Sequence, residues 1–427
     1  MKILIKNGHV LDPLTGVDEQ RDVLIRDGKI ERVARQIPEE NIDKTINANG
    51  AYVMPGIIDL HVHMREPGFE YKETITTAGK AAARGGVTTM CAMPNTKPVI
   101  DTKEKVEMVH RKASKESLVN VIQLGAVTMG QEGKELADIA GMAEADCHAI
   151  SEDGKSVMNV ELYKKAMKIA AKYQVSIFAH CEDASLVQGG VMNDSNRAEE
   201  LGMKGISNES EDVVVERDIK LAKETGVKLH LCHCSTKDSV KMLEQAKNMG
   251  LSVTGEVCPH HFTLSTADIT ENDGNYKMNP PLREVEDVVA LRQGLRDNIL
   301  DVIATDHAPH SEEDKEGGIE KAAFGIVGLE TLLSLTYTEL VKKQVLTPLQ
   351  MVEKLSMNPA KILGLNDRGS IVEGKIADIV VFNQDQEYFI DKNDFVSKGK
   401  NTPFNGRKVC GEVRYTIVAG NIVYEAK

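Results

Sequence analysis

The 427-residue chain has no run of about 18 apolar residues, so its sequence contains no candidate for a membrane-spanning helix. The opening stretch MKILIKNGHVLDP turns polar before the core of a signal peptide could form, and we therefore expect a cytoplasmic protein. Compositionally biased tracts are also absent. Hydrophobic residues make up 41% and charged residues 27%, which is typical of a globular protein and excludes disorder as the main state.

Basic residues are too few to balance the acidic ones. The chain has 52 Lys and Arg against 65 Asp and Glu, which gives a formal net charge of −13. A field of this sign repels phosphate backbones and anionic lipid surfaces. We therefore expect no nucleic-acid partner and no membrane partner.

Cysteines are few and scattered. The seven are Cys91, Cys147, Cys181, Cys232, Cys234, Cys258 and Cys410. An odd number without dense spacing argues against a disulfide scaffold. Only Cys232 and Cys234 are close together, and they lack the second pair that a structural zinc site requires. We expect buried, reduced thiols that serve in packing.

Both ends of the chain have the pattern of short strands. Residues 2–6 (KILIK) and 22–26 (DVLIR) each precede an Asn-Gly or Asp-Gly dipeptide, which favours a tight hairpin turn. A strand pattern returns near the other end, at residues 377–382 (ADIVVF). We therefore expect β structure at both ends of the chain, in residues 1–54 and 365–427.

The middle of the chain, residues 55–364, alternates short apolar runs with helical stretches such as 73–84 and 288–300. Eight candidate strands begin near Gly56, Thr88, Asn120, Cys147, Ser176, Lys228, Ser252 and Asp301. Eight βα units suggest a closed (β/α)8 barrel, that is, an α/β fold. A doubly wound open sheet has the same periodicity, so this pattern alone leaves both architectures open.

Residues of the types that bind metals end several of these strands. In GIIDLHVHMREPG, strand alternation places His61 and His63 on one face at the C-terminal end, where active sites of such barrels gather. Taken alone, two nearby histidines could also be polar neighbours. Other strands end in Asp153, His180, His233 and Asp306. Four His and two Asp could hold two divalent metals, with one Asp bridging them and a position open for water.

Several motifs resemble one known family. HVHMREPG, FAHCED, HLCHCS and DHAPH resemble the amidohydrolase superfamily, and most closely the longer bacterial dihydroorotases. Arg65, MPNT from Met93, MNPPLR from Met278 and DHAPH from Asp306 carry the closer likeness. The resemblance implies a TIM-like (β/α)8 barrel flanked by a small β-sandwich domain that both termini form.

The resemblance also implies a ligand set for two divalent metal ions, with Zn²⁺ as the expected ion. His61, His63 and Asp306 would hold one ion, and His180 and His233 the other. Many relatives bridge their metals with a carboxylated Lys, but the matching segment ISEDGK presents Asp153. Lys155 lies nearby and leaves the bridging assignment open, although a solvated surface charge is its expected role.

The family interconverts N-carbamoyl-L-aspartate and L-dihydroorotate in pyrimidine biosynthesis. The mechanism implied here is attack of a metal-bound hydroxide on the ring carbonyl. Asp306 would take the hydroxide proton and return it to the ring nitrogen. As alternatives, Asp306 could be a helix cap or only a metal ligand.

Both compounds carry a carboxylate, which the planar fork of an Arg can bind at two points. The resemblance implies a substrate set of His63, Arg65, Asn95, Asn279, His310, Phe324 and Gly325. Arg65, Asn95 and His310 would face the carboxylate, whereas Asn279 and the backbone at 324–325 would contact the ring. Other readings stay open: a rim ion pair for Arg65, turn positions for the two Asn beside Pro94 and Pro280, and an ordinary loop role for His310.

Other residues have less specific signals. His260 and His261 could pack strands as well as serve catalysis, and His148, His230 and His307 are expected to be structural. Residues 311–325 could form a mobile loop over the site or only a solvated connection.

Two alternatives to a dihydroorotase remain. Another cyclic-amide hydrolase, such as an allantoinase or a dihydropyrimidinase, would use the same metals. A non-catalytic subunit that scaffolds aspartate transcarbamoylase would have lost metal ligands, and every expected ligand is present here. An active enzyme could still bind that partner, and a homodimer is the expectation for the family.

Overall fold

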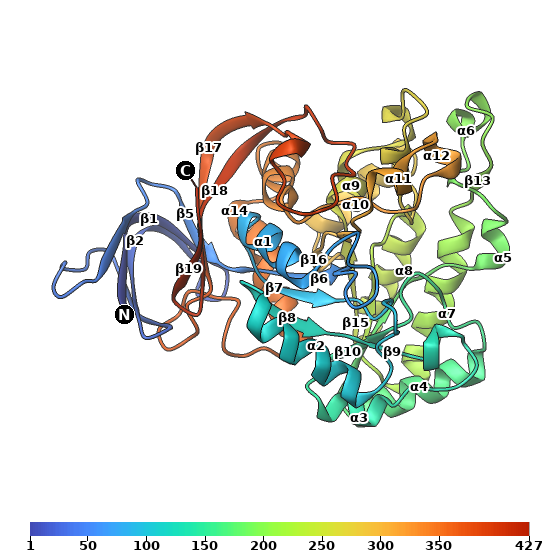
Figure 1. Cartoon of the computed structure of the whole chain (residues 1–427), viewed down its shortest axis with the longest axis horizontal. Coiled ribbons are helices and arrows are strands. Elements are labelled where there is room, and N and C mark those ends of the chain that lie inside the picture. Colours follow the sequence, from blue (N-terminus) through green and yellow to red (C-terminus); the bar gives the residue numbers. More distant parts are fainter. Residues whose placement is uncertain (427) are drawn as a thin grey trace.

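The computed structural model describes residues 1–426 and has a parallel barrel at its centre (Figure 1). The barrel strands are β6 (Ile57–Val62), β7 (Val87–Ala92), β8 (Asn120–Gln123), β9 (Gly125–Ala126), β10 (Ala149–Ser151), β11 (Ser176–Ala179), β14 (Leu229–Leu231), β15 (Val253–Val257) and β16 (Val302–Ile303). Adjacent strands pair in parallel. Each of the eight predicted strand positions is therefore occupied by a strand of the barrel.

The ring of strands is closed, which decides between the two architectures that the sequence left open. Only Leu124 separates β8, which pairs with β7, from β9, which pairs with β10. On the other side, Val62 forms a parallel bridge with His307, and the His63 N–H donates to the His307 carbonyl at 2.9 Å. The predicted barrel is confirmed, and the open sheet is excluded.

Helices cover the outside of the barrel. They include α1 (Ile75–Arg84), α2 (Lys103–Glu116), α3 (Ile139–Glu144), α4 (Val160–Lys172), α7 (Glu209–Thr225), α8 (Lys237–Asn248), α10 (Val285–Arg296), α13 (Leu332–Thr336), α14 (Pro348–Val352) and α15 (Asn358–Leu363). In α1, Thr74 caps the first turn by accepting from the Thr77 N–H, and an alanine-rich face is buried. The helix predicted at 288–300 runs instead from Val285 to Arg296. It cannot continue through Asn298, whose φ is positive at 59°.

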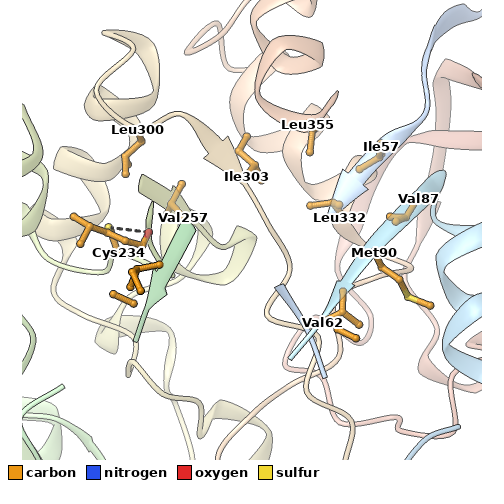
Figure 2. Close-up of a cluster of buried hydrophobic side chains, with 14 of the residues drawn as sticks. Ile57, Val62, Val87, Met90, Cys234, Val257, Leu300, Ile303, Leu332 and Leu355 are labelled. Carbon is orange, nitrogen blue, oxygen red and sulfur yellow. Dashed lines mark hydrogen bonds between the residues drawn. The ribbon is translucent and has the colours of Figure 1, made fainter. Parts of the chain in front are cut away.

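The main core lies between strands and helices. In Figure 2, Ile57 and Val87 of the first two strands lie close to Leu332 and Leu355 of the last helices. These side chains are at most 1% exposed, so the beginning and end of the barrel segment share one core. None of the helices in the described part of the chain is both long and apolar enough to cross a bilayer.

The two ends of the chain form a second sheet beside the barrel (Figure 1). Its strands are β1 (Lys2–Asp12), β2 (Val17–Arg26), β3 (Lys29–Ala34), β4 (Lys44–Asn47), β5 (Tyr52–Pro55), β17 (Ile379–Phe389), β18 (Lys408–Val418) and β19 (Asn421–Glu425). The antiparallel pair β17–β5, with Val381 opposite Val53, joins the C-terminal strands to the N-terminal ones. Ile3, Val23 and Ile417 are buried in the core of this sheet.

The segment between β17 and β18 returns to the barrel. Figure 1 shows the two long strands reaching across from the small sheet towards the barrel. Phe395 and Phe404 are buried there in a cluster with Ile326 and Leu335 of the barrel segment. The segment between β17 and β18, which we expected in the β domain, thus packs against the part of the chain that follows the last barrel strand.

Candidate metal centre

The predicted metal ligands come together at the C-terminal ends of the barrel strands. His61 lies in β6 and His63 directly follows it, while the others lie one to three residues beyond the ends of their strands: Asp153, His180, His233 and Asp306. Every one of the six is at most 7% exposed. Strands 245 residues apart in the sequence, β6 and β16, therefore contribute to one buried cluster.

Four side chains form the first half of this cluster. Asp306 Oδ1 lies 3.1 Å from His63 Nε2 and 3.5 Å from His61 Nε2. Asp153 lies on the other side, with Oδ1 3.2 Å from His61 Nε2 and Oδ2 3.4 Å from His63 Nε2. The two imidazoles and two carboxylates converge on one point, as ligands of a divalent cation do.

The second half of the cluster is formed by His180 and His233. His180 Nδ1 lies 2.9 Å from His233 Nε2, and each of these atoms lies 3.7 Å from Asp153 Oδ1. Asp153 therefore stands between the two pairs of histidines. The arrangement fits the bridging position better than Lys155, which is exposed and donates to the Gln131 carbonyl.

Unsatisfied buried atoms indicate that the residues fit a metal. Among residues 1–426, His61 Nε2 and Asp153 Oδ1 are buried without a hydrogen-bond partner. Such orphaned polar atoms are costly unless an ion or water satisfies them. Imidazole nitrogens with carboxylate oxygens suit zinc and similar divalent ions, so the donor set is that of a metal site.

The carboxylates and histidines of the cluster shift each other's pKa values. Burial raises the pKa of Asp306, but the nearby His61 and His63 outweigh it and lower that pKa to about 2. Burial also opposes charge on His61, yet Asp153 and Asp306 raise the pKa of His61 well above its ordinary value. Asp306 is therefore ionised at neutral pH.

A buried carboxylate that we did not predict orients the first ligand. Glu256, in β15, has Oε1 2.8 Å from His61 Nδ1 and Oε2 3.0 Å from His230 Nε2. A proton on His61 Nδ1 that is held by Glu256 leaves Nε2 free for a metal. The only signal in the sequence was one acidic residue within a predicted strand. His230 contacts Glu256 in the buried interior, which is the structural role expected for it.

Three residues of the site have strained backbones. Arg65, His233 and Asp306 have φ values of 62°, 33° and 50°, in the left-handed region that is unfavourable for such side chains. Each lies two or three residues beyond the end of a barrel strand and lines the cavity at the mouth of the barrel. Strain of this kind is retained where the surrounding structure enforces it, commonly at functional sites.

A cavity of about 200 Å³ lies over the metal cluster. It is lined by His63, Arg65, Asn95, Asp153, Gly154, His180, His233, Asn279, Asp306, Ala308, Phe324 and Gly325. The structure thus brings together every predicted substrate residue except His310, which lies just behind the lining. Cys258, His260 and His261 form a separate buried cluster, in which His261 Nε2 contacts the Pro280 carbonyl at 2.9 Å.

The two predicted asparagines have different positions. Asn95 contacts two of the predicted metal ligands, with Oδ1 3.0 Å from His63 Nδ1 and Nδ2 3.4 Å from Asp153 Oδ2. Asn279 donates through Nδ2 to Glu182 at 2.8 Å. Because a carboxylate only accepts, this bond fixes the amide and leaves Asn279 Oδ1, which is buried and has no partner within the described chain, as an acceptor at the cavity.

Arg65 and His310 lie against each other. Arg65 donates through Nε to the Pro309 carbonyl at 3.1 Å, and its Nη2 lies 3.2 Å from His310 Nε2. His310 Nε2 is also 2.8 Å from the Phe324 carbonyl, and its Nδ1 is 3.1 Å from Lys72 Nζ. Burial, together with the positive charges of Arg65 and Lys72, lowers the pKa of His310 to about 3. His310 is therefore neutral at pH 7.

The backbone of Gly325 is already fully hydrogen-bonded. Its N–H donates to the Lys277 carbonyl at 3.0 Å, and its carbonyl accepts from Lys315 at 2.9 Å and from Asn401 at 3.0 Å. With φ of 125°, the position requires glycine, and a Cβ would come within 2.6 Å of Ala308 Cβ. Its predicted contact with the ring would therefore be van der Waals packing and not a backbone hydrogen bond.

Lys315 anchors the segment that could have been a mobile loop. Its Nζ donates to the carbonyls of Lys277, Ala323 and Gly325 at 2.7 to 3.0 Å. Burial lowers the pKa of this lysine to about 7. Residues 311–325 are therefore tied to the barrel mouth from within.

A closed barrel whose strand ends gather four His and two Asp around one cavity defines a metal-dependent hydrolase of the amidohydrolase superfamily. Solved structures support this class. An L-hydantoinase (dihydropyrimidinase) from Arthrobacter aurescens superposes with a TM-score of 0.90 at 26% identity, covering 99% of this chain and 96% of that one. A dihydropyrimidinase from Brevibacillus agri, 24% identical with a TM-score of 0.87, shares the fold. The predicted barrel with a β-sandwich domain is confirmed.

Curated sequences identify the family. A dihydroorotase from Pelotomaculum thermopropionicum is 46% identical over 425 residues, which are 100% of this chain and 99% of the relative. One from Ligilactobacillus salivarius is 47% identical over 428 residues, with the same coverage. The family model described as dihydro-orotase-like matches residues 50–239. The chain belongs to the dihydroorotase family.

Proposed function

We propose that the chain interconverts N-carbamoyl-L-aspartate and L-dihydroorotate at the cavity over the metal cluster. The observation that carries the proposal is the position of Asp153 between two pairs of histidines, beside a cavity lined by Arg65 and Asn279. Two divalent ions, with Zn²⁺ as the proposed metal, would be held by His61, His63, Asp306, His180 and His233, with Asp153 shared. Bound there, such ions polarise a carbonyl oxygen and acidify water.

Asp306 is the proposed proton carrier. Its carboxylate is ionised at neutral pH, which is the form that a general base requires to take the proton of the attacking water. In the hydrolytic direction it then delivers that proton to the ring nitrogen as the amide bond breaks. In the direction of ring closure, it takes the proton from the carbamoyl nitrogen.

The polar groups around the cavity match those of dihydroorotate. Arg65 supplies a cation for the substrate carboxylate, and Asn95 lies beside the metal ligands at the same wall. Asn279 presents an acceptor, which suits a ring N–H. His310 can add an N–H donor if its ring turns from the Phe324 carbonyl towards the carboxylate. Phe324 and Gly325 complete the wall against the ring.

A parallel assay tests this proposal. Protein loaded with Zn²⁺ is tested for cyclisation of carbamoyl aspartate and for hydrolysis of dihydroorotate, allantoin and dihydrouracil, with a chelator-treated control. We expect chelator-sensitive turnover of the first two compounds only. Turnover of allantoin or dihydrouracil alone would refute the substrate assignment, and no turnover with metal bound would refute catalysis.

Three further statements depend on the family resemblance and belong to the same proposal. The protein forms a homodimer, it functions in the cytoplasm, and it can associate with aspartate transcarbamoylase. Mass measurement in solution, with and without that enzyme, tests the first and third. The extent of the two domains, residues 55–364 for the barrel and 1–54 with 365–427 for the β domain, is likewise proposed.

A further inference from the structure

The segment that links β17 to β18, residues 390–407, brings one buried polar side chain to the mouth of the barrel. Asn401 is only 4% exposed and lies behind the residues that line the cavity. It comes from the part of the chain that we assigned to the β domain. None of the predicted site residues lies in this segment.

The amide of Asn401 connects two loops of the barrel mouth. Its Oδ1 accepts from the His310 N–H at 3.0 Å, and its Nδ2 donates to the carbonyls of Ala308 and Gly325, both at 3.0 Å. Its own carbonyl accepts from the Val327 N–H at 2.9 Å. One side chain therefore fixes the backbone after Asp306 and the backbone of the 324–327 turn.

These two loops carry the part of the site proposed to bind the substrate carboxylate and ring. Ala308 and Gly325 line the cavity, and His310 contacts the neighbouring Phe324 carbonyl. We propose that Asn401 is a positioning residue for substrate binding, because it sets the spacing between His310 and Gly325. This inference depends on the function proposed above.

The chemistry of the contact requires an amide. One planar group must accept once and donate twice, which Asn can do and Asp cannot, since a carboxylate would face two carbonyl oxygens without a proton to share. A smaller side chain would leave the buried His310 N–H and the Ala308 carbonyl without this partner. Asn401 is thus matched to its neighbours by hydrogen-bonding type as well as by size.

The segment has anchors of its own, so Asn401 is held in place independently of the site. Glu330 accepts from the backbone N–H groups of Val396 and Ser397, and Glu73 accepts from that of Lys398. Gly399 lies directly against the 308–310 loop, where a Cβ would approach Pro309 to 2.7 Å. The two loops are therefore hydrogen-bonded to a segment that other residues hold in place.

The variants Asn401→Asp and Asn401→Ser test the proposal in the full-length, Zn²⁺-loaded protein. Readouts are KM and kcat for dihydroorotate, bound zinc per chain and the thermal midpoint. We expect KM to rise roughly tenfold or more in Asn401→Asp, and less in Asn401→Ser, with kcat changed far less and zinc content unchanged. The control is Asn405→Asp, at an exposed residue of the same segment whose side chain accepts from the Lys392 N–H. It should keep the wild-type KM.

A second measurement separates positioning from a general structural role. If Asn401 acts through His310, then Asn401→Ser should raise KM less in a His310→Ala background than in the wild type. If Asn401→Ser raises KM by the same factor in both backgrounds, the two residues act independently and the proposal is overturned. An unchanged KM in the Asn401 variants, or variants that only unfold, would also overturn it. Failure of the wild type to turn over dihydroorotate would instead refute the proposed function, and this inference with it.

Discussion

The metal side and the substrate side of the cavity are built in different ways. The proposed metal ligands lie in or within three residues of barrel strands, and a buried carboxylate, Glu256, contacts the first of them, His61. The substrate side consists of loops, which Lys315 and Asn401 hold from behind. We infer that the metal site is fixed by the barrel itself, whereas substrate affinity depends on contacts between segments far apart in the sequence.

The largest effect on turnover should come from Asp306, which belongs to the proposed metal cluster and also lines the cavity. Asp306→Asn should lower kcat by roughly 10²- to 10⁴-fold, because the amide cannot accept the proton of the attacking water. Steady-state kinetics with a metal assay check this. Asp297→Asn, at the exposed end of α10, is the control. Near-normal kcat with metal bound would remove Asp306 from proton transfer.

A change confined to the metal side should alter metal affinity first. Glu256→Gln should weaken zinc binding roughly 10- to 100-fold, because His61 Nδ1 loses its carboxylate partner. Competition with a chelator of known affinity measures this. The control Glu286→Gln alters an exposed pair with Lys237 and should leave affinity unchanged. Equal zinc affinity in both variants would contradict the orienting role of Glu256.

A change confined to the substrate side should leave the metals in place. Arg65→Met removes the cation that faces the cavity and should raise KM for dihydroorotate roughly tenfold or more, while zinc content stays the same. Arg111→Met, at an exposed site of α2, is the matched control. An unchanged KM would exclude Arg65 from substrate binding.

The smallest effect should be one of pH on stability. The pKa of His310 in the folded chain, about 3, is below its ordinary value of about 6.5, so the unfolded chain binds the proton more readily. The contribution of neutral His310 to stability is therefore fully present above pH 6.5 and is lost as the pH falls towards 3. His310→Asn should lose roughly 1–2 kcal/mol less than the wild type between pH 7 and pH 5. Denaturant unfolding at both pH values measures it, and parallel losses in the two proteins would contradict the shifted pKa.

The sequence was most informative where function depends on local pattern. Strand periodicity placed all eight barrel strands, and each metal-type residue could be recognised because it ends a strand. The spacing could not distinguish a closed barrel from an open sheet, because closure depends on the contact of Val62 and His63 with His307, more than 240 positions away.

Other features depended on contacts that no local pattern indicates. Glu256 and Asn401 act on residues 195 and 91 positions away, so neither stood out in the sequence. The orientation of the Asn279 amide is set by Glu182, 97 positions away. Gly325 was predicted to contact the ring through its backbone, yet both of its polar groups are already bonded to other residues.

The most direct test of the account is a titration of chelator-stripped protein with Zn²⁺, with dihydroorotate hydrolysis followed at each addition. If Asp153 bridges two ions over the proposed cavity, activity should be negligible without metal and should reach its plateau at two zinc ions per chain. Full activity without metal, or no activity once two ions are bound, would contradict it.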